Sequence, residues 1–296
     1  MRRFDADDIR RYYDRHTPGF LSRGQGRGTG SIHRAVWGPG ITTRRAAFHY
    51  VHDRIAALAR SLPGTSGSPR LLDLGCGVSA SLCYLATRLA IRGTGVTLSP
   101  VQREIAETRI RREGLSDRIR CIEGDFNALP DDVGTVDLAY AIESFVHGAS
   151  PDRFFAECRR VIRPGGLLVV CDDFRRPSSD HQSSHAIQRF REGWHINTLI
   201  SRDDLVRLSQ SAGFELDSAT DLTQWLEIHR VRDRLLGVPM NVFDRTCRAL
   251  QPLLRLDPPV IDRANRRFGH LLGGQALQIC LAQGWVGYDL AVLRRQ

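Results

Sequence analysis

The segment LLDLGCGVSASLCYLA, residues 71–86, decides the fold of this 296-residue chain. An apolar run leads to Asp73, a turn containing Gly75 and Gly77 follows, and small residues then open a helical pattern. This order predicts a buried strand, a tight glycine turn and a helix. Because such a turn can approach a phosphate, a dinucleotide or a nucleoside, the rest of the sequence must identify the ligand.

Outside this segment, strand and helix patterns alternate regularly. Strands are predicted over residues 70–76, 93–99, 119–126, 136–144, 167–174 and 285–295, and helices over residues 51–62, 80–91, 100–115 and 152–166. A further helix is predicted after Ser201, which is its expected N-cap, and residues 224–283 have a mostly helical pattern. This alternation predicts an α/β fold, a doubly wound and mostly parallel sheet with helices on both faces. Its ligand is expected at the carboxyl ends of the strands. The first 50 residues resemble a flexible, glycine-rich lead-in.

Composition restricts the classes of partner and compartment. The net charge is +9, and all basic residues other than histidine are arginines, since the sequence contains no lysine. These arginines are dispersed, which favours plain surface charge or a small anionic ligand over nucleic acid. Seven scattered cysteines without a CxxC pair indicate reduced thiols, and no apolar run is long enough for a membrane span. We therefore expect a cytoplasmic protein with a small-molecule substrate, and leave a homo-oligomer open.

Two phosphate-binding interpretations of the glycine turn fit poorly. A dinucleotide fold needs a third glycine where Ala80 stands, and an acid near the end of the next strand, which instead ends in Thr97, Leu98 and Ser99. A P-loop needs a lysine after its glycines, and the chain has none. The sequence thus disfavours both.

Four ordered motifs support a different interpretation of the glycine turn. They are LLDLGCG at 71–77, GVTLSPVQ at 95–102, IRCIEGDFNALP at 119–130 and VIRPGG at 161–166. In this order and spacing the chain resembles the class I S-adenosylmethionine-dependent methyltransferases over roughly residues 65–175. The chain departs from the family pattern in one respect: the glycine turn usually continues with further glycines, and Ser79 and Ala80 occupy those positions here.

The resemblance implies roles for individual cofactor residues. Gly75 and Gly77 would let the backbone approach the methionine part, and Asp73 would hold the turn or face the amino group. Gln102, next to Thr97 and Leu98, would lie by the ribose hydroxyls, although it could also be an exposed helix residue. Asp125 would bind the adenine amino group with Phe126 packed on the ring, although Asp125 could also be a turn acid and Phe126 a core residue.

The end of the fourth strand, AYAIESFVHGASP, lacks the Asn/Asp-Pro-Pro-aromatic motif of enzymes that methylate nucleobase amines. It is similar to the sterol, tocopherol and prenyl diphosphate C-methyltransferases, where an acid is followed by histidine, here Glu143 and His147. This resemblance favours methyl transfer to carbon of an isoprenoid-type alkene such as a prenyl diphosphate, with Glu143 stabilising the carbocation and removing the proton. O- or N-methylation of a natural product, with Glu143 or His147 as base, and an inactive binding module remain alternatives.

The same subgroups suggest how the substrate is enclosed. Segments IRRYYDRHTPGF and IHRAVWGPG resemble their N-terminal caps, so residues 1–50 would cover the active site, 51–223 would form the core, 224–283 a helical substrate-binding insertion and 284–296 the last strand. Tyr12 is a catalytic candidate. The substrate-binding candidates are Tyr13, Phe20, His33, Trp37, Arg175 and Trp225. Asp172 and Asp173 could hold Mg²⁺ with a diphosphate or be ordinary loop acids. Tyr12 and Tyr13 could also be the face of a docking helix, Glu143 a structural acid that binds backbone amides, and His147 a residue at a helix start.

Overall fold

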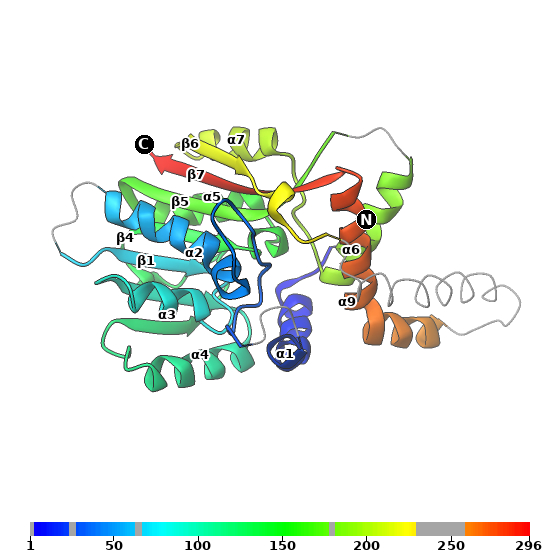
Figure 1. Ribbon diagram of the computed structural model, residues 1–296, viewed down its shortest axis with the longest axis horizontal. Helices are drawn as coiled ribbons and strands as arrows, with labels where there is room; N and C mark the ends of the chain where they lie inside the picture. Colours follow the sequence, from blue (N-terminus) through cyan, green and yellow to red (C-terminus); the bar gives the residue numbers. More distant parts are fainter. Residues whose placement is uncertain (1–2, 24–27, 63–66, 178–180, 229–257) are drawn as a thin grey trace, which may run out of the picture.

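The computed structural model is built around one sheet of seven strands in the order β3-β2-β1-β4-β5-β7-β6 (Figure 1). It describes residues 3–23, 28–62, 67–177, 181–228 and 258–296. The strands are β1 (Arg70–Leu74), β2 (Arg92–Thr97), β3 (Ile119–Glu123), β4 (Val136–Ile142), β5 (Ile162–Arg175), β6 (Phe214–Asp221) and β7 (Val286–Arg295). β1 to β5 pair in parallel, and β7 runs antiparallel to both β5 and β6. The predicted doubly wound, mostly parallel sheet is therefore confirmed.

Helices cover both faces of the sheet, and each face has its own apolar core. On one face, α2 (Arg44–Ser61), α3 (Ala80–Ala86) and α4 (Pro100–Arg112) contribute buried side chains that include Ile55, Leu82 and Ile110. On the other, α5 (Pro151–Val161) and α7 (Arg202–Ser211) contribute Phe154 and Leu205. Because both faces are buried, the central strands are apolar on both sides, as a parallel sheet requires.

A second group of helices lies beside the carboxyl ends of the strands (Figure 1). It contains α1 (Ala6–Arg23), α6 (His181–Trp194) and α9 (Pro258–Ala282), with short 3₁₀ turns at η2 (Phe145–His147) and η3 (Thr223–Trp225). A further 3₁₀ turn, η1 (Asp131–Val133), precedes β4. α6 and α9 share an apolar cluster that includes Phe190 and Leu277. α1 is tied to the start of α4, since Asp14 accepts a hydrogen bond from Ser99 Oγ at 2.5 Å.

Helix starts follow the expected capping chemistry. The Ser201 hydroxyl accepts the Asp204 amide hydrogen at 3.0 Å, so its predicted N-cap role is confirmed. Ser99 caps α4 in the same way and is followed by Pro100 at the first helical position. The Ser99 cap sets α4 directly after the end of β2.

Three local predictions were wrong. Residues 6–23, predicted as part of a flexible lead-in, form helix α1 with Ile9 and Tyr12 buried. α2 begins at Arg44, ahead of the predicted residue 51, because Thr43 caps it by accepting the Ala46 amide hydrogen. Gly165 and Gly166 do not close α5, which ends at Val161: Arg163 precedes a proline and is disfavoured in a helix, and the chain enters β5 there.

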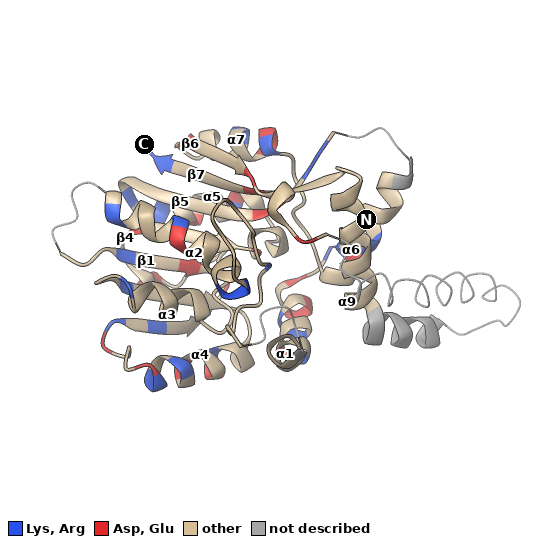
Figure 2. Ribbon diagram, in the orientation of Figure 1, with Lys and Arg blue, Asp and Glu red and all other residues tan. Residues whose placement is uncertain are grey.

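The described arginines are scattered over helices, strand ends and loops (Figure 2). Many are paired within the fold, for example Arg176 with Asp289 at 2.5 Å and Arg163 with Asp137 at 2.6 Å. None of the described helices is long and apolar enough to cross a membrane. Most of the predicted insertion, residues 229–257, lies outside the described residues.

Candidate active site

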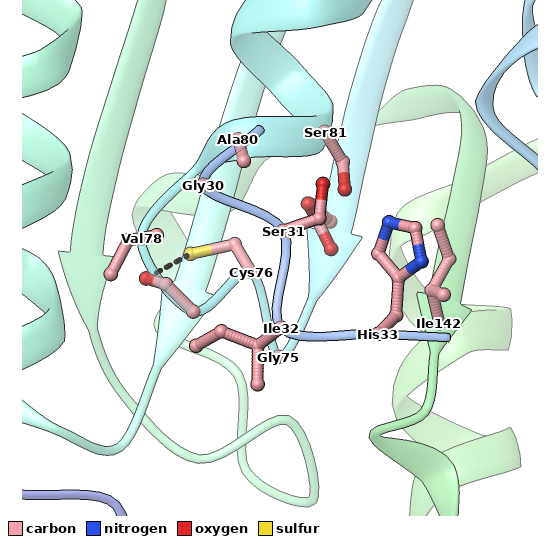
Figure 3. Close-up of a pocket in the computed structure, with 12 residues that line it drawn as sticks. Gly30, Ser31, Ile32, His33, Gly75, Cys76, Val78, Ala80, Ser81 and Ile142 are labelled. Carbon is pink, nitrogen blue, oxygen red and sulfur yellow. Dashed lines mark hydrogen bonds between the residues drawn. The ribbon is translucent and has the colours of Figure 1, made fainter. Parts of the chain in front are cut away.

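A pocket opens where β1 turns into α3 (Figure 3). The turn and α3 form one wall, and residues 30–33 of the segment before α2 cross over it as the other (Figure 3). The lining residues are Gly30, Ser31, Ile32, His33, Asp73, Gly75, Cys76, Gly77, Val78, Ala80, Ser81 and Ile142. The structure thus brings together four predicted site residues, Asp73, Gly75, Gly77 and His33.

Asp73 is the buried acid of this pocket. Its side chain is 3% exposed, and its Oδ2 atom has no hydrogen-bond partner among the described residues. Burial raises the pKa of this carboxyl group to about 7, although the nearby Tyr140 hydroxyl acts to lower it. A buried carboxylate oxygen without a donor is costly, so the pocket is suited to a ligand that brings a cationic or hydrogen-donating group.

Gly75 and Gly77 both have positive φ angles, +87° and +53°. At Gly75 an added Cβ would lie 2.5 Å from Ser144 Cβ, so the glycine lets the turn pack against the end of β4. At Gly77 the nearest atom to an added Cβ would be Ile32 Cδ1, at 3.7 Å. The first glycine is therefore required by packing and backbone angle together, and the second mainly by its backbone angle.

On the next strands, the predicted ribose and adenine contacts lie outside the pocket-lining set. Gln102 is buried, accepting a hydrogen bond from Thr97 Oγ1 at 2.8 Å and donating one to Thr17 Oγ1 on α1 at 3.0 Å. It is therefore not an exposed helix residue. Leu98 is half-buried. The contacts of Thr97, Leu98 and Gln102 with a ribose stay predictions.

Asp125 and Phe126 follow β3. Asp125 Oδ1 accepts hydrogen bonds from the Asn127 amide at 2.8 Å and the Asn127 side chain at 3.0 Å, as a turn acid does. Phe126 is buried, with its ring beside the Cβ position of Gly75 at 3.8 Å and edge-on to Phe154. Their predicted contacts with adenine therefore compete with, or add to, these structural roles.

Glu143 directly follows β4 and is held by donors from two distant segments. Its Oε1 atom accepts hydrogen bonds from the Arg34 amide at 2.8 Å, Arg34 Nε at 3.0 Å and the Tyr288 hydroxyl at 3.0 Å. Burial acts to raise the pKa of Glu143, but the charge and hydrogen bonds of Arg34 hold it below its ordinary value. The carboxylate is thus a stable anion and a weak base.

Asp172 and Asp173, predicted as loop acids or Mg²⁺ ligands, lie inside strand β5 and are almost fully buried. The loop interpretation is therefore wrong. Asp173 pairs with Arg34 Nη1 at 2.9 Å, while Asp172 accepts the Val146 amide hydrogen at 3.1 Å. Burial raises the pKa of both carboxyls, most strongly that of Asp172. In the described part of the chain, no group of three or more His, Cys, Asp or Glu side chains is placed to hold a metal ion.

His147 ends the 3₁₀ turn η2 and forms a hydrogen-bonded pair with Tyr13 of α1. Its Nδ1 atom lies 3.2 Å from the His195 carbonyl oxygen, which can only accept, so Nδ1 carries the proton. Nε2 is then an acceptor, and it receives the Tyr13 hydroxyl hydrogen at 2.7 Å. Burial lowers the pKa of His147 to about 4, so the imidazole is neutral at pH 7.

The segment after α6 supports this turn. The amides of Asn197 and Thr198 both donate to the Val146 carbonyl, at 2.9 and 2.8 Å, and the Asn197 side chain donates to the His147 carbonyl at 3.0 Å. His195 has a φ of +56°. Among the described residues only Ser79, Glu143 and His195 combine a side chain with positive φ. All three flank this site, where backbone strain commonly concentrates.

The other predicted substrate residues are distributed over three places. Tyr12 is buried in α1 and packs on His195, with ring centroids 4.7 Å apart, and Phe20 lies near His270 of α9. Trp37 and Trp225 are joined to each other by a backbone hydrogen bond of 2.7 Å and do not line the pocket.

Arg175 is exposed at the end of β5. Its backbone amide donates to the Ile200 carbonyl at 2.8 Å. It is not among the residues that line the pocket.

Comparisons with known proteins agree with this geometry. The family model described as a methyltransferase domain matches residues 72–170. The 27-O-demethylrifamycin SV methyltransferase of Amycolatopsis mediterranei is 32% identical over 198 residues, which are 66% of this chain and 70% of that protein. The chain belongs to the class I S-adenosylmethionine-dependent methyltransferases.

Two further similarities concern methyl transfer to carbon. The 24-methylenesterol C-methyltransferase 2 of rice, Oryza sativa subsp. japonica, is 30% identical over 199 residues, which are 65% of this chain but only 52% of that protein. A structure of geranyl diphosphate methyltransferase with GPP and sinefungin superposes with a TM-score of 0.69 and 21% identity, covering 98% of this chain and 99% of the other. At that identity the methyltransferase fold is shared, and nothing more follows.

The pocket fits the methionine part of the methyltransferase cofactor. S-adenosylmethionine carries an ammonium group, and the unpartnered Oδ2 of Asp73 is the kind of acceptor such a group needs. Gly75, Gly77 and Ser81 line the same pocket, and Ile32 and His33 cover it from the N-terminal segment. These are the residues that would hold this end of the cofactor in the methyltransferase.

Several residues of this site were missed by the sequence analysis. Arg34, Tyr288 and His195 hold Glu143 and His147, although they lie far from them in the chain. Only Arg34 gave a signal, because it stands between His33 and Trp37 in a segment already linked to the cap. Tyr288 and His195 reach the site through the antiparallel β7 and the loop after α6, which local patterns do not reveal.

Proposed function

We propose that the methyltransferase transfers the methyl group of S-adenosylmethionine to a hydroxyl oxygen of a small natural product, with His147 as the base and Tyr13 as the group that passes the proton to it. The observation that carries this proposal is the 2.7 Å hydrogen bond from the Tyr13 hydroxyl to His147 Nε2. The His195 carbonyl holds the imidazole in the tautomer that leaves this nitrogen as an acceptor.

The chemistry assigns a task to each of these groups. Bound S-adenosylmethionine supplies an electrophilic methyl group, and methylation of a hydroxyl releases one proton. Tyr13 would accept the substrate proton on its oxygen while its own hydroxyl proton moves to His147 Nε2. The imidazolium so formed is disfavoured by burial and favoured by the negative charge of Glu143, which acts to raise the pKa of His147. Glu143 would therefore assist by its charge.

Transfer to carbon of an isoprenoid-type alkene is the second candidate. A buried anion at the end of β4 could stabilise a carbocation, and Glu143 has this position and a strained φ of +52°. The similarity to a sterol C-methyltransferase supports it. Against Glu143 as the base, its Oε1 already accepts three hydrogen bonds.

A diphosphate head group finds less support among the described residues. Arg176 is paired with Asp289 and Asp221, and Asp173 is paired with Arg34. Arg175, a predicted substrate-binding residue, is exposed at the end of β5 and could contact a diphosphate there. Mg²⁺ with a prenyl diphosphate therefore belongs only to this second candidate.

The test combines a substrate screen with two variants. Purified protein and S-adenosylmethionine with a labelled methyl group are incubated with hydroxylated macrolides, phenols, sterols and prenyl diphosphates. Products are assigned as O-methyl or C-methyl by NMR. We expect O-methylation, lost by about 10²- to 10⁴-fold in His147→Gln and by a smaller factor in Glu143→Gln. Calorimetry with S-adenosylhomocysteine should show equal cofactor affinity in both variants.

A C-methylated product, together with an inactive Glu143→Gln variant and an active His147→Gln variant, would contradict O-methylation and favour transfer to carbon. Tyr13→Phe tests the proton relay, because this substitution removes the hydroxyl group and keeps the ring. If His147 acts through Tyr13, this variant should lose activity together with His147→Gln.

A further inference from the structure

Two cysteine thiols meet under the cofactor turn. Cys76 stands between Gly75 and Gly77, and Cys121 lies on β3, two strands away from β1. Their sulfur atoms are 3.5 Å apart. The side chains are 8% and 7% exposed, and Cys76 lines the pocket, as Figure 3 shows.

The meeting depends on a glycine of the strand between them. Gly95 of β2 is paired in register with Cys121 of β3. A Cβ added at Gly95 would lie 2.7 Å from Cys76 Sγ, so Cys76 occupies the space that a side chain there would fill. The absence of a side chain at Gly95 therefore brings the turn thiol beside the strand thiol.

We propose that Cys76 and Cys121 form an oxidisable dithiol that small peroxides convert to a disulfide, and that this modification disturbs the cofactor turn. In the first step the thiolate of one of the two cysteines attacks a peroxide oxygen, giving a sulfenic acid and releasing water once a proton is taken up. In the second step the sulfur of the other cysteine attacks the sulfenic sulfur, its thiol proton joins the departing hydroxide, and a second water leaves. Two thiols and one hydrogen peroxide thus give one disulfide and two waters.

The two sulfur atoms share one hydrogen bond, in which either thiol can be the donor. Contact with Cys76 lowers the pKa of Cys121, whereas burial raises the pKa of Cys76. The pocket gives a small oxidant access to Cys76, and the Cys121 sulfur lies beside it.

Bond formation would move the turn. A disulfide needs a sulfur separation of about 2.05 Å, so the thiols must approach by about 1.5 Å. The Gly75 and Cys76 amides both donate to the Val96 carbonyl at 2.9 Å, and these bonds fix the turn that carries Gly75 and Gly77. Displacing Cys76 therefore reshapes the wall that contains the cofactor-binding glycines. The disulfide itself does not rest on the proposed acceptor, but the loss of cofactor binding rests on the cofactor site.

The experiment treats the full chain with hydrogen peroxide, removes the oxidant, and follows two independent readouts. Peptide mapping without reductant should show a Cys76–Cys121 cross-link with the loss of two hydrogens. Calorimetry should show affinity for S-adenosylhomocysteine lowered by at least about tenfold, and restored by dithiothreitol. Cys121→Ser should bind S-adenosylhomocysteine and resist peroxide, whereas Cys158→Ser, with the same substitution on α5, should behave as wild type.

Each readout can fail separately. No Cys76–Cys121 peptide in the treated wild type would overturn the dithiol, and this measurement needs no variant. A cross-linked protein that binds S-adenosylhomocysteine as tightly as the reduced protein would overturn the effect on the turn. If reduced wild type failed to bind S-adenosylhomocysteine, the cofactor site would be wrong while the cross-link could still form.

Discussion

Asp73 and Glu143 are buried carboxylic acids at the ends of neighbouring strands, and their surroundings differ. Asp73, at the end of β1, has one oxygen without a hydrogen-bond partner among the described residues, and burial raises its pKa to about 7. Glu143, after β4, accepts three hydrogen bonds on one oxygen, and Arg34 holds its pKa below the ordinary value. Asp73 therefore has an oxygen to which a cationic ligand group could bind, whereas Glu143 is already paired with the Arg34 guanidinium.

This difference separates the two halves of the site. On the proposed cofactor side, Asp73 Oδ2 has no hydrogen-bond donor among the described residues. A donor supplied by a bound ligand would therefore stabilise the complex. On the acceptor side, a fixed anion and a neutral imidazole are already organised in the absence of substrate. Substitutions can therefore break one half while leaving the other intact.

The largest effect is expected from Arg34→Met, which removes the cation shared by Glu143 and Asp173. The Arg34 guanidinium bonds Glu143 at 3.0 Å and Asp173 at 2.9 Å, and loss of one partner of a buried ion pair typically costs about 3–5 kcal/mol. The free energy of unfolding, measured in urea at pH 7, should fall by that amount. The double variant Arg34→Met with Glu143→Gln should recover part of it, and equal stability of both variants would show that Glu143 does not depend on Arg34.

The glycine turn that lines the pocket could be predicted from the sequence because it is local, whereas its contacts with the cofactor stay a prediction. One strand, one turn and one helix start carry Asp73, Gly75 and Gly77, and the period of the apolar residues locates all three elements. The predicted sheet followed from the same alternation of strands and helices. The absence of lysine, which a P-loop needs, disfavoured a P-loop interpretation of the glycine turn on chemical grounds.

The acceptor half could be predicted only in part. Glu143 and His147 were recognised at the end of β4, but their partners Arg34, Tyr288 and His195 come from the N-terminal segment, the last strand and a loop. Such contacts depend on how distant elements pack, and no local pattern encodes them. α1 was missed for a related reason, since the glycine-rich stretch after it concealed a helix whose buried face contacts other elements.

The second effect concerns the pH dependence of stability without cofactor. The folded pKa of Asp73 is about 7, above its unfolded value of 3.8, so the unfolded state releases this proton first and stability falls as pH rises between those values. Above pH 7 the penalty is complete and amounts to about 4 kcal/mol at most.

Asp73→Asn should remove this part of the decline. Urea unfolding of both proteins from pH 4 to pH 8 measures it, and the difference between the two curves isolates Asp73 from Asp172 and Asp173, whose raised pKa values act in the same direction. Parallel curves would mean that Asp73 titrates normally.

The third effect is on cofactor affinity. A charge-assisted hydrogen bond contributes about 1.5–3 kcal/mol, so Asp73→Asn should weaken S-adenosylhomocysteine binding by about 10- to 100-fold in calorimetry at pH 8. Asp53→Asn is the matched control, because it makes the same chemical change on an exposed acid of α2 that does not line the pocket. Equal weakening by both substitutions would contradict a specific role for Asp73.

The smallest effect is a proton released on cofactor binding. Near pH 6 most of Asp73 is protonated in the free protein, since its pKa is about 7. An ammonium group beside the carboxylate favours the charged form, so binding lowers this pKa and expels the proton. Affinity for S-adenosylhomocysteine should therefore rise with pH below 7, by at most about tenfold per pH unit, and level off above it.

Calorimetry at pH 6 in buffers of different ionisation enthalpy measures the protons released. Wild type should release up to one, Asp73→Asn should release fewer, and Glu143→Gln, whose acid is already ionised, should match the wild type. Release that is the same in Asp73→Asn would assign the proton to another group and remove the contrast between the two acids.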